Sequence, residues 1–249
     1  MKKHDELTLA EVAAYLGWTP RFVERLAVGG KLPGREADGI WRFKRSDLVD
    51  WLDQKIQTLD LAQVAELEHH FESELEKDGL LPRPHPAPLA TRLHPAGIDL
   101  ALPAARKTEV LKALVAVAAR TGAVADPGLL AGSLAEREAL CSTALPGGVA
   151  IVHPRRPLPA AIRGTILAFA RTLEPVDFGA ADGERTQVFF LLAALDEREH
   201  LHALARLMRV LRDGGVAAMA RAPDADAVLS ILRQREHEID AGTRGGRPA

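Results

Sequence analysis

The chain has 249 residues, with 32 Lys and Arg against 34 Asp and Glu, so its formal charge is −2. Apolar residues make up 47% and charged residues 27%, which is typical of a globular protein of one or two domains. This balance excludes a polycation that coats nucleic acid by bulk charge, and the single cysteine, Cys141, excludes internal disulfides and cysteine-based zinc sites.

Charge divides the chain into three segments. Residues 1–56 carry 10 basic and 9 acidic groups, residues 57–80 carry 1 and 7, and residues 81–249 carry 21 and 18. An acidic stretch between two near-neutral blocks predicts two domains with a spacer. We expect the boundaries at 1–56 for a first domain, 57–88 for an acidic helix and Pro-rich linker, 89–240 for a second domain and 241–249 for a flexible tail.

The first block has the pattern of a winged helix-turn-helix. An amphipathic helix over Leu9–Leu16 is capped by Thr8, and Thr19-Pro20 opens a second helix that Gly29-Gly30 ends. Asp38-Gly39 predicts a hairpin, and Ser46-Asp47 opens a third helix.

Basic residues follow this layout. Residues 19–45 hold 7 basic and 3 acidic groups. A helix in the major groove needs long polar side chains facing outward, and a wing needs cations that meet phosphates. The candidate DNA-binding residues are Arg21, Arg25, Arg35, Arg42, Lys44 and Arg45.

Three motifs carry a family resemblance in this block: Leu9-Ala10-Glu11-Val12-Ala13-Ala14-Tyr15-Leu16, Lys31-Leu32-Pro33-Gly34, and the run from Trp41 to Leu52. Over about residues 7–56 the chain resembles the excisionase/MerR-like DNA-binding domain. The resemblance implies a small winged domain that reads short DNA sites, usually as a multimer. The alternative is that the same fold binds a protein partner.

A fourth helix is predicted from Asp60 to Lys77, acidic and with a narrow apolar stripe. Such a stripe favours a partner helix, so it either docks on a domain or forms a homodimer through residues 60–77. Pro82 to Pro88 predicts an extended linker.

The last block interleaves helices and strands, which predicts an α/β domain. The expected helices are Lys107–Thr121, Pro127–Glu138, Glu199–Arg212 and Asp224–Arg235, and the expected strands are Val149–Val152, Thr165–Phe169 and Gln187–Leu195.

An apolar strand ends at His153, where function often lies in such sheets. A histidine that accepts a phosphoryl group must be neutral, with one nitrogen held as a donor and the other carrying the lone pair. The phosphoryl oxygens need hydrogen-bond donors, but transfer between two histidines needs no metal or other cofactor. The candidate donors are Arg137, Ser142, Thr143, Arg155 and His200.

Over about residues 89–240 the chain resembles the enzyme IIA domain of the fructose/mannitol/nitrogen class of the bacterial sugar phosphotransferase system. The matching motifs are Arg137-Glu138, Ser142-Thr143, Gly148-Val149-Ala150-Ile151 with His153, Asp177-Phe178-Gly179-Ala180 with Asp182-Gly183, and Glu199-His200-Leu201. The resemblance implies a central mixed sheet flanked by helices. It also implies that His153 is phosphorylated by a small histidine-phosphorylated carrier protein, with His200 and Arg137 as partners. The loop before the strand departs from the family, since Ala144 and Pro146 replace glycines, the family's Asn is missing, and Val152 replaces the proline before the histidine.

These observations predict a cytoplasmic DNA-binding regulator that couples the phosphotransferase system, in its nitrogen-regulatory branch, to transcription. The sequence has no signal-peptide core or long apolar run, so no membrane partner is expected. Two alternatives remain: a phosphocarrier whose winged domain is a protein adaptor, and a DNA-binding protein whose enzyme IIA domain is silent. His202 is predicted to be structural, and Cys141 to be a small buried residue.

Overall fold

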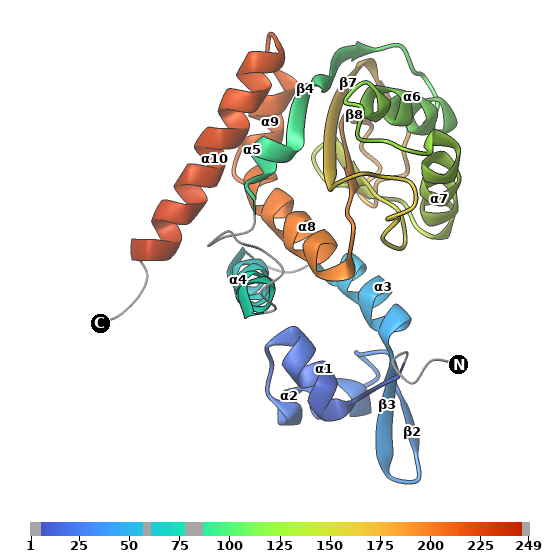
Figure 1. Ribbon diagram of the computed structural model, residues 1–249, viewed down its shortest axis with the longest axis vertical. Coiled ribbons are helices and arrows are strands. Elements are labelled where there is room, and N and C mark those ends of the chain that lie inside the picture. The colour runs from blue at the N-terminus through green and yellow to red at the C-terminus, as the bar shows by residue number, and fades with distance from the viewer. Residues whose placement is uncertain (1–5, 57–60, 78–86, 246–249) are drawn as a thin grey trace. The chain divides into compact units, whose positions relative to one another are not determined.

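The computed structural model describes residues 6–56, 61–77 and 87–245, in two compact units, Met1–Pro84 and His85–Ala249. The predicted fold class is confirmed, because the first unit is mainly helical with a hairpin and the second combines helices with a five-stranded mixed sheet (Figure 1). Among the described residues, no helix is both long and apolar enough to span a bilayer.

Short-range signals shape the N-terminal unit. Thr8 Oγ1 accepts the Glu11 N–H, and the Glu11 carboxylate accepts the Thr8 N–H at 2.7 Å, which is the predicted capping box. Gly17 ends the first helix with φ +68°. The elements are β1 (Glu6–Thr8), α1 (Leu9–Leu16), α2 (Pro20–Val28), β2 (Arg35–Ala37), β3 (Ile40–Lys44), α3 (Arg45–Ile56) and α4 (Leu61–Lys77).

The predicted hairpin is present as β2 and β3. Asp38 and Gly39 both have positive φ, 53° and 74°, as a two-residue hairpin turn requires. The sequence did not predict β1, which pairs with β3 and gives the antiparallel order β1-β3-β2. Three residues are too few to show a period, so this strand is defined by its pairing with β3, in which Leu7 lies opposite Phe43.

Helix α4 docks on α1 in its own unit. His70 Nε2 donates to the Tyr15 carbonyl at 3.0 Å, and the Phe71 ring packs edge-on to Tyr15 with centroids 6.2 Å apart. Docking is therefore one of the two predicted outcomes, while a homodimer through residues 60–77 stays a prediction. Most of the predicted linker, residues 78–86, lies outside the described residues, as do residues 57–60.

The C-terminal unit is built on the strand order β4-β7-β8-β6-β5. β4 is parallel to β7 and β6 is parallel to β8, whereas β7–β8 and β5–β6 are antiparallel. The elements are α5 (Leu89–Arg92), β4 (Leu93–Leu102), α6 (Lys107–Ala119), α7 (Pro127–Leu140), β5 (Ala144–Leu145), β6 (Val149–Val152), β7 (Ile166–Val176), β8 (Thr186–Ala193), α8 (Glu197–Leu211), α9 (Gly215–Ala220) and α10 (Ala225–Gly245).

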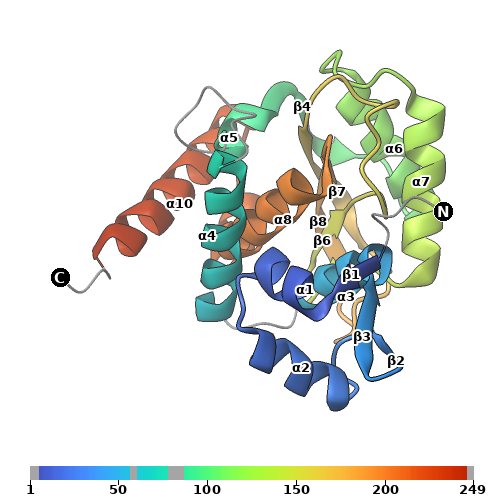
Figure 2. The same ribbon diagram turned by 60° about the horizontal axis from the view of Figure 1, so that its bottom comes forward.

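Helices cover both faces of this sheet. Both ribbon views place α6 and α7 on one side and α8 and α10 on the other (Figures 1 and 2), and Figure 1 shows α9 on the same side as α10. Along β8, Phe189 and Leu191 belong to the core under α6 and α7, whereas Val188 and Phe190 alternate with them and are also buried. A strand buried on both faces is apolar throughout, which explains the continuous run that predicted it.

Three elements of the C-terminal unit differ from the prediction. β4 was not predicted because it contains Pro95, which an edge strand tolerates. β7 runs to Val176, well past Phe169. α10 runs to Gly245 instead of ending at Arg235, so residues 241–245 are helical and not part of a flexible tail; residues 246–249 lie outside the described part.

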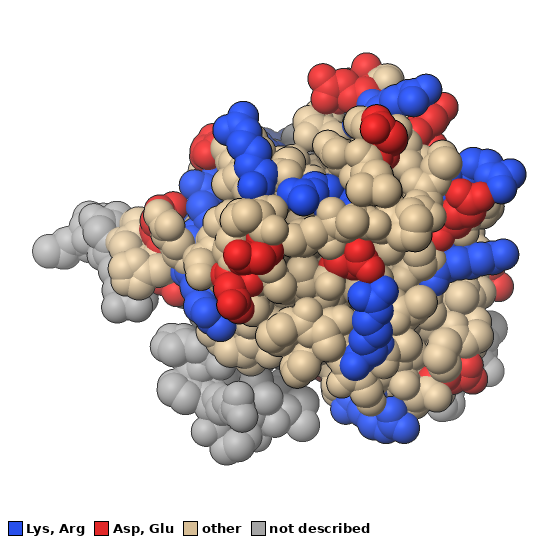
Figure 3. Space-filling model, turned by 90° about the horizontal axis from the view of Figure 1, so that it is seen from above, with Lys and Arg blue, Asp and Glu red and all other residues tan. Residues whose placement is uncertain are grey.

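Charges of both signs are interspersed on one face of the molecule (Figure 3). Figure 3 shows one face on which Lys and Arg are scattered among Asp and Glu, with most of the area contributed by other residues. Charges also pair across elements, as in the Arg120–Asp99 ion pair at 2.8 Å. A nucleic-acid surface must therefore come from a local cluster of cations.

Candidate active site and nucleic-acid interface

Two histidines meet at one edge of the C-terminal sheet. His153 directly follows β6, and His200 lies in the first turns of α8, which follows β8. Because β6 and β8 are parallel neighbours, with Val152 opposite Leu191, their carboxyl ends lie at the same edge. The two imidazole rings are 5.1 Å apart between centroids.

The backbone sets the tautomer of His153. Its Nδ1 lies 2.8 Å from the Ile151 carbonyl oxygen. Because a carbonyl oxygen can only accept, Nδ1 carries the proton in this bond, and the neutral ring has its lone pair on Nε2. This is the arrangement that a nucleophilic imidazole needs.

The loop before β5 is tied to the same strand. Thr143 accepts the Ile151 N–H on its carbonyl oxygen at 3.2 Å, one peptide group from the oxygen that holds His153. Arg137 donates from Nη1 to the Cys141 carbonyl at 2.9 Å, which fixes the end of α7 where the loop begins. The predicted residues Ser142 and Thr143 thus belong to a loop that is hydrogen-bonded to the histidine strand, and Arg137 on α7 holds the start of this loop.

The two hydroxyl groups of this loop are engaged by protein acceptors. Ser142 Oγ donates to the Phe178 carbonyl at 2.7 Å, and Thr143 Oγ1 donates to Glu138 Oε2 at 2.6 Å. The Thr143 N–H also donates to Glu138, at 3.0 Å. Here the two residues shape the loop, and their use as donors to a phosphoryl group stays a prediction.

Glu138 and Lys107 support the loop, and sequence reasoning assigned neither a role. Lys107 Nζ lies 2.8 Å from Glu138 Oε1, and 4.8 Å from the centroid of the Phe178 ring. A Cβ on Gly179 would lie 3.4 Å from this ammonium group and 3.5 Å from Ser142 Oγ, so the turn after β7 packs closely here. The pair is separated by 31 residues, and no local pattern links them.

The remaining candidates of this unit differ in their exposure. Arg155 is exposed in the loop after β6. His202 is buried, and burial together with the charges of Arg92 and Arg206 lowers its pKa to about 3, which agrees with the predicted structural role. Cys141 is exposed, so the prediction that it is buried is wrong: it follows α7 at the surface, where its carbonyl accepts a hydrogen bond from Arg137.

In the N-terminal unit, α2 presents two arginines. Arg21 and Arg25 are both exposed, and the Arg25 guanidinium lies 5.0 Å from the Phe22 ring centroid. Val23 and Ala27 form the buried side of the helix. The helix therefore has the cationic outer face and apolar inner face that were predicted.

The hairpin gathers the other cations. Arg35 is directly opposite Arg42 across the β2–β3 pair, and Lys44 lies two residues farther on the same face of β3. Arg35 also pairs with Glu6 at 2.7 Å. Arg45, at the start of α3, lies half-buried with its guanidinium 5.3 Å from the Tyr15 ring centroid.

Comparison with known proteins agrees with both units. Residues 93–235 match the family "Phosphoenolpyruvate-dependent sugar phosphotransferase system, EIIA 2", and residues 6–56 match a helix-turn-helix domain family. The chain belongs to this enzyme IIA family. The enzyme IIA match covers more than half of the sequence, and the helix-turn-helix match lies entirely before it.

The relatives cover the enzyme IIA unit almost end to end. The chain is 37% identical over 148 residues to a nitrogen regulatory protein of Bradyrhizobium diazoefficiens, which spans 58% of this chain and 94% of the relative. It is 27% identical to a fructose-like EIIA component of Escherichia coli, over 55% of this chain and 92% of that one. The crystal structure of nitrogen regulatory protein IIA-Ntr from Neisseria meningitidis superposes with a TM-score of 0.53 at 27% identity, covering 58% of this chain and 98% of that one.

Proposed function

We propose that this protein is a DNA-binding regulator whose enzyme IIA unit accepts a phosphoryl group on His153 from a histidine-phosphorylated carrier protein. The observation that carries the proposal is the ring pair: His153 has its Nδ1 held by the Ile151 carbonyl, and its ring is 5.1 Å from that of His200. The relation to nitrogen regulatory proteins favours regulation over sugar transport as the outcome of transfer.

The transfer step balances without a metal or other cofactor. The lone pair of His153 Nε2 attacks phosphorus, a new N–P bond forms, and the N–P bond of the carrier's phosphohistidine breaks. The electron pair returns to the carrier's imidazole, which leaves as a neutral group when its other nitrogen holds a proton. The Ile151 carbonyl keeps its hydrogen bond to Nδ1–H throughout, so no proton has to leave His153 during the step.

The charge that develops on the phosphoryl oxygens needs donors. His200 is the side chain placed closest to this role by the ring contact, and Arg137 has further N–H groups besides the one it donates to Cys141. Lys107 adds a positive charge to the loop through Glu138. Ser142, Thr143 and Arg155 remain proposed stabilisers of the phosphoryl group, and the two hydroxyls would have to leave their present acceptors, Phe178 and Glu138, to act as donors.

The N-terminal unit supplies the DNA contacts of the proposal. Arg21 and Arg25 on α2 would enter the major groove, while Arg35, Arg42 and Lys44 on the hairpin would meet phosphates, with Arg45 beside them. A phosphoryl group adds about −1.5 to −2 charges at neutral pH. That change lets the state of the carrier alter DNA binding in a chain whose net charge is only −2.

A second candidate is a silent enzyme IIA unit that serves as a docking module. The engaged hydroxyls of Ser142 and Thr143 favour it, as does Pro146, which offers no N–H to a phosphoryl group. A phosphoenolpyruvate-driven relay of enzyme I and carrier protein distinguishes the two, with uptake read by intact mass. Uptake by the native chain, followed by DNA binding with and without the phosphoryl group, supports the regulator; no uptake beside a labelled enzyme IIA control supports the silent module.

A further inference from the structure

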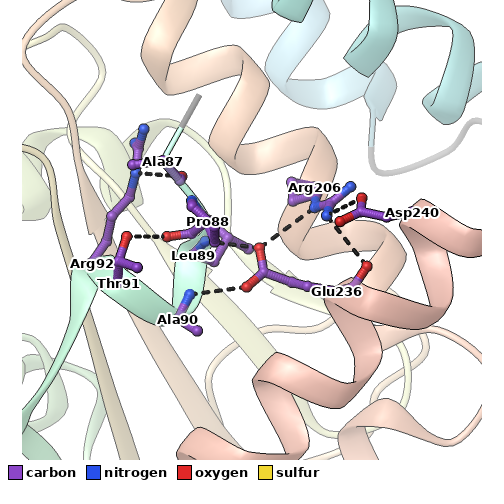
Figure 4. A network of polar contacts seen from close by, with 9 residues as sticks. All are labelled: Ala87, Pro88, Leu89, Ala90, Thr91, Arg92, Arg206, Glu236 and Asp240. Atoms are coloured by element: carbon purple, nitrogen blue, oxygen red, sulfur yellow. Dashed lines mark hydrogen bonds and ion pairs between the residues drawn. The ribbon is translucent and has the colours of Figure 1, made fainter. Parts of the chain in front are cut away.

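A buried polar network ties the start of the C-terminal unit to α8 and α10. Glu236 on α10 accepts the Leu89 N–H at 2.8 Å and the Ala90 N–H at 3.0 Å, across 147 and 146 residues (Figure 4). Helix α5 has four residues and no capping side chain of its own, so this carboxylate supplies its cap. The side chain of Glu236 is only 5% exposed.

Arg206 on α8 holds that carboxylate in place. Its guanidinium lies 3.5 Å from Glu236 Oε1 and also pairs with Asp240 one turn farther along α10 (Figure 4). Because an unpaired buried carboxylate would be costly, the cap of α5 depends on this arginine. Glu236 and Asp240 both lie beyond residue 235, where the match to the enzyme IIA family ends.

Arg92 on α5 connects this part of the unit to Glu199, the residue before His200. Its Nε donates to the Ala87 carbonyl at 3.2 Å (Figure 4), and its Nη2 lies 2.9 Å from Glu199 Oε1. Glu199 immediately precedes His200, and its own N–H donates to Asp196, the N-cap of α8. The Arg92 side chain is only 8% exposed, so this charge is weakly screened by water.

We infer that Arg92 is a positioning residue for the histidine pair. Through its ion pair with Glu199 it fixes the first turn of α8, where His200 lies. It thereby connects His200 to α5 and to the end of α10, which both lie outside the residues 93–235 that match the family. This inference rests on the proposed function, since it concerns the same site. Arg92 does not touch the phosphoryl group in this scheme. It acts by holding the carboxylate beside His200 and by balancing its charge.

The Arg92–Glu199 ion pair gives the inference a specific signature. The Glu199 and His200 N–H groups both donate to Asp196 at the start of α8. Because Arg92 and Glu199 act on this turn as one pair, removing either partner should loosen the same turn, and removing both should add little more.

The decisive experiment measures amide hydrogen exchange at Glu199 and His200 by NMR in the full-length chain, as native protein, Arg92→Gln, Glu199→Gln and the double variant. We expect each single variant to speed this exchange about tenfold and the double variant to add little more, because the two charges form one pair. Arg120→Gln, which breaks the ion pair to Asp99 at 2.8 Å, is the matched control and leaves the exchange at Glu199 and His200 unchanged. Native exchange in Arg92→Gln, or additive effects in the double variant, overturn the inference.

Phosphoryl uptake from the carrier protein provides the second measurement. We expect Arg92→Gln to lower kcat about tenfold with little change in KM for the carrier, because the histidine turn is displaced while the docking surface is kept. A native kcat in Arg92→Gln overturns the positioning role. If the native chain takes up no phosphoryl group, the proposed function fails, and the hydrogen-exchange result still decides the inference. Should Arg92→Gln not fold, faster exchange at His200 in Glu199→Gln supports the inference, and native exchange there overturns it.

Discussion

Each of the two units is stabilised internally, and the contacts that do so differ in their separation along the sequence. In the winged unit, Thr8 caps a helix three residues away and Asp38-Gly39 turns the chain within the hairpin. In the enzyme IIA unit, the cap of α5 comes from Glu236, 147 residues from Leu89, and the two site histidines come from different strand ends. Local signals build the helix-turn-helix unit, whereas bringing His153 and His200 together requires the whole sheet.

The largest expected effect tests the reacting pair. His153→Ala should lose phosphoryl uptake by about a thousandfold or more, because the nitrogen that forms the bond is gone. His200→Ala keeps the acceptor and should slow uptake by about 10²-fold. Intact mass after the carrier-driven relay measures both, with His237→Ala, an exposed position on α10, as control. Full uptake by His153→Ala would show that another residue is the acceptor.

The buried histidine His202 on α8 gives the next prediction. The pKa of His202 is lowered to about 3, so between its ordinary 6.5 and that value the unfolded chain binds a proton that the folded chain does not. Stability therefore falls as the pH drops through this window, by at most about 1.4 kcal/mol per pH unit. Urea unfolding at several pH values should show this slope in the native chain and its loss in His202→Gln.

The matched control for this prediction is His237→Gln on α10, which should keep the native slope. The same slope in His202→Gln would mean that other groups produce the acid sensitivity, and that burial of His202 does not exclude its proton.

In the winged unit, the docking of α4 can be broken at Gly17. A Cβ there would lie 2.5 Å from His70 Nδ1, on a residue with φ +68°. Gly17→Ala should lower the free energy of unfolding by about 2 kcal/mol, from left-handed backbone strain plus the displaced imidazole. Gly30, with φ +65° and open space around it, is the matched control and should lose about 1 kcal/mol on substitution by Ala.

Chemical denaturation of both glycine variants measures the difference, and adding His70→Ala to Gly17→Ala should restore part of the loss. Equal losses at Gly17 and Gly30 would argue that α4 does not press on this turn.

The smallest expected effect concerns the exposed arginines of α2. Arg21→Ala with Arg25→Ala should weaken DNA binding about 10- to 100-fold and reduce the salt dependence by about two ions, because two phosphate or base contacts are lost. Fluorescence anisotropy over a salt series measures both quantities. Arg120→Ala in the other unit is the control, and an unchanged salt slope in the double variant would exclude α2 from the DNA surface.

The same contrast between local and long-range contacts explains which elements could be predicted from the sequence. It found α1, α2 and the hairpin because their caps and turns are formed by neighbouring residues. It missed β1 and β4, since a strand of three residues and a proline-containing edge strand are defined only by their partners. It ended α10 at Arg235, because the bonds from Arg206 that stabilise the rest of the helix come from α8.

For the site, the residue types pointed to His153 and His200, and the tertiary structure decided what surrounds them. The apolar strand ending in His153 and the motif at Glu199-His200 are visible in the sequence. The hydrogen bond from His153 to Ile151, the commitment of Thr143 to Glu138, and the tie from Arg92 to Glu199 are not. Caps and turns depend on chemistry within a few residues, whereas a tautomer, an engaged hydroxyl and a buried ion pair depend on groups that meet only when the sheet and its helices have packed.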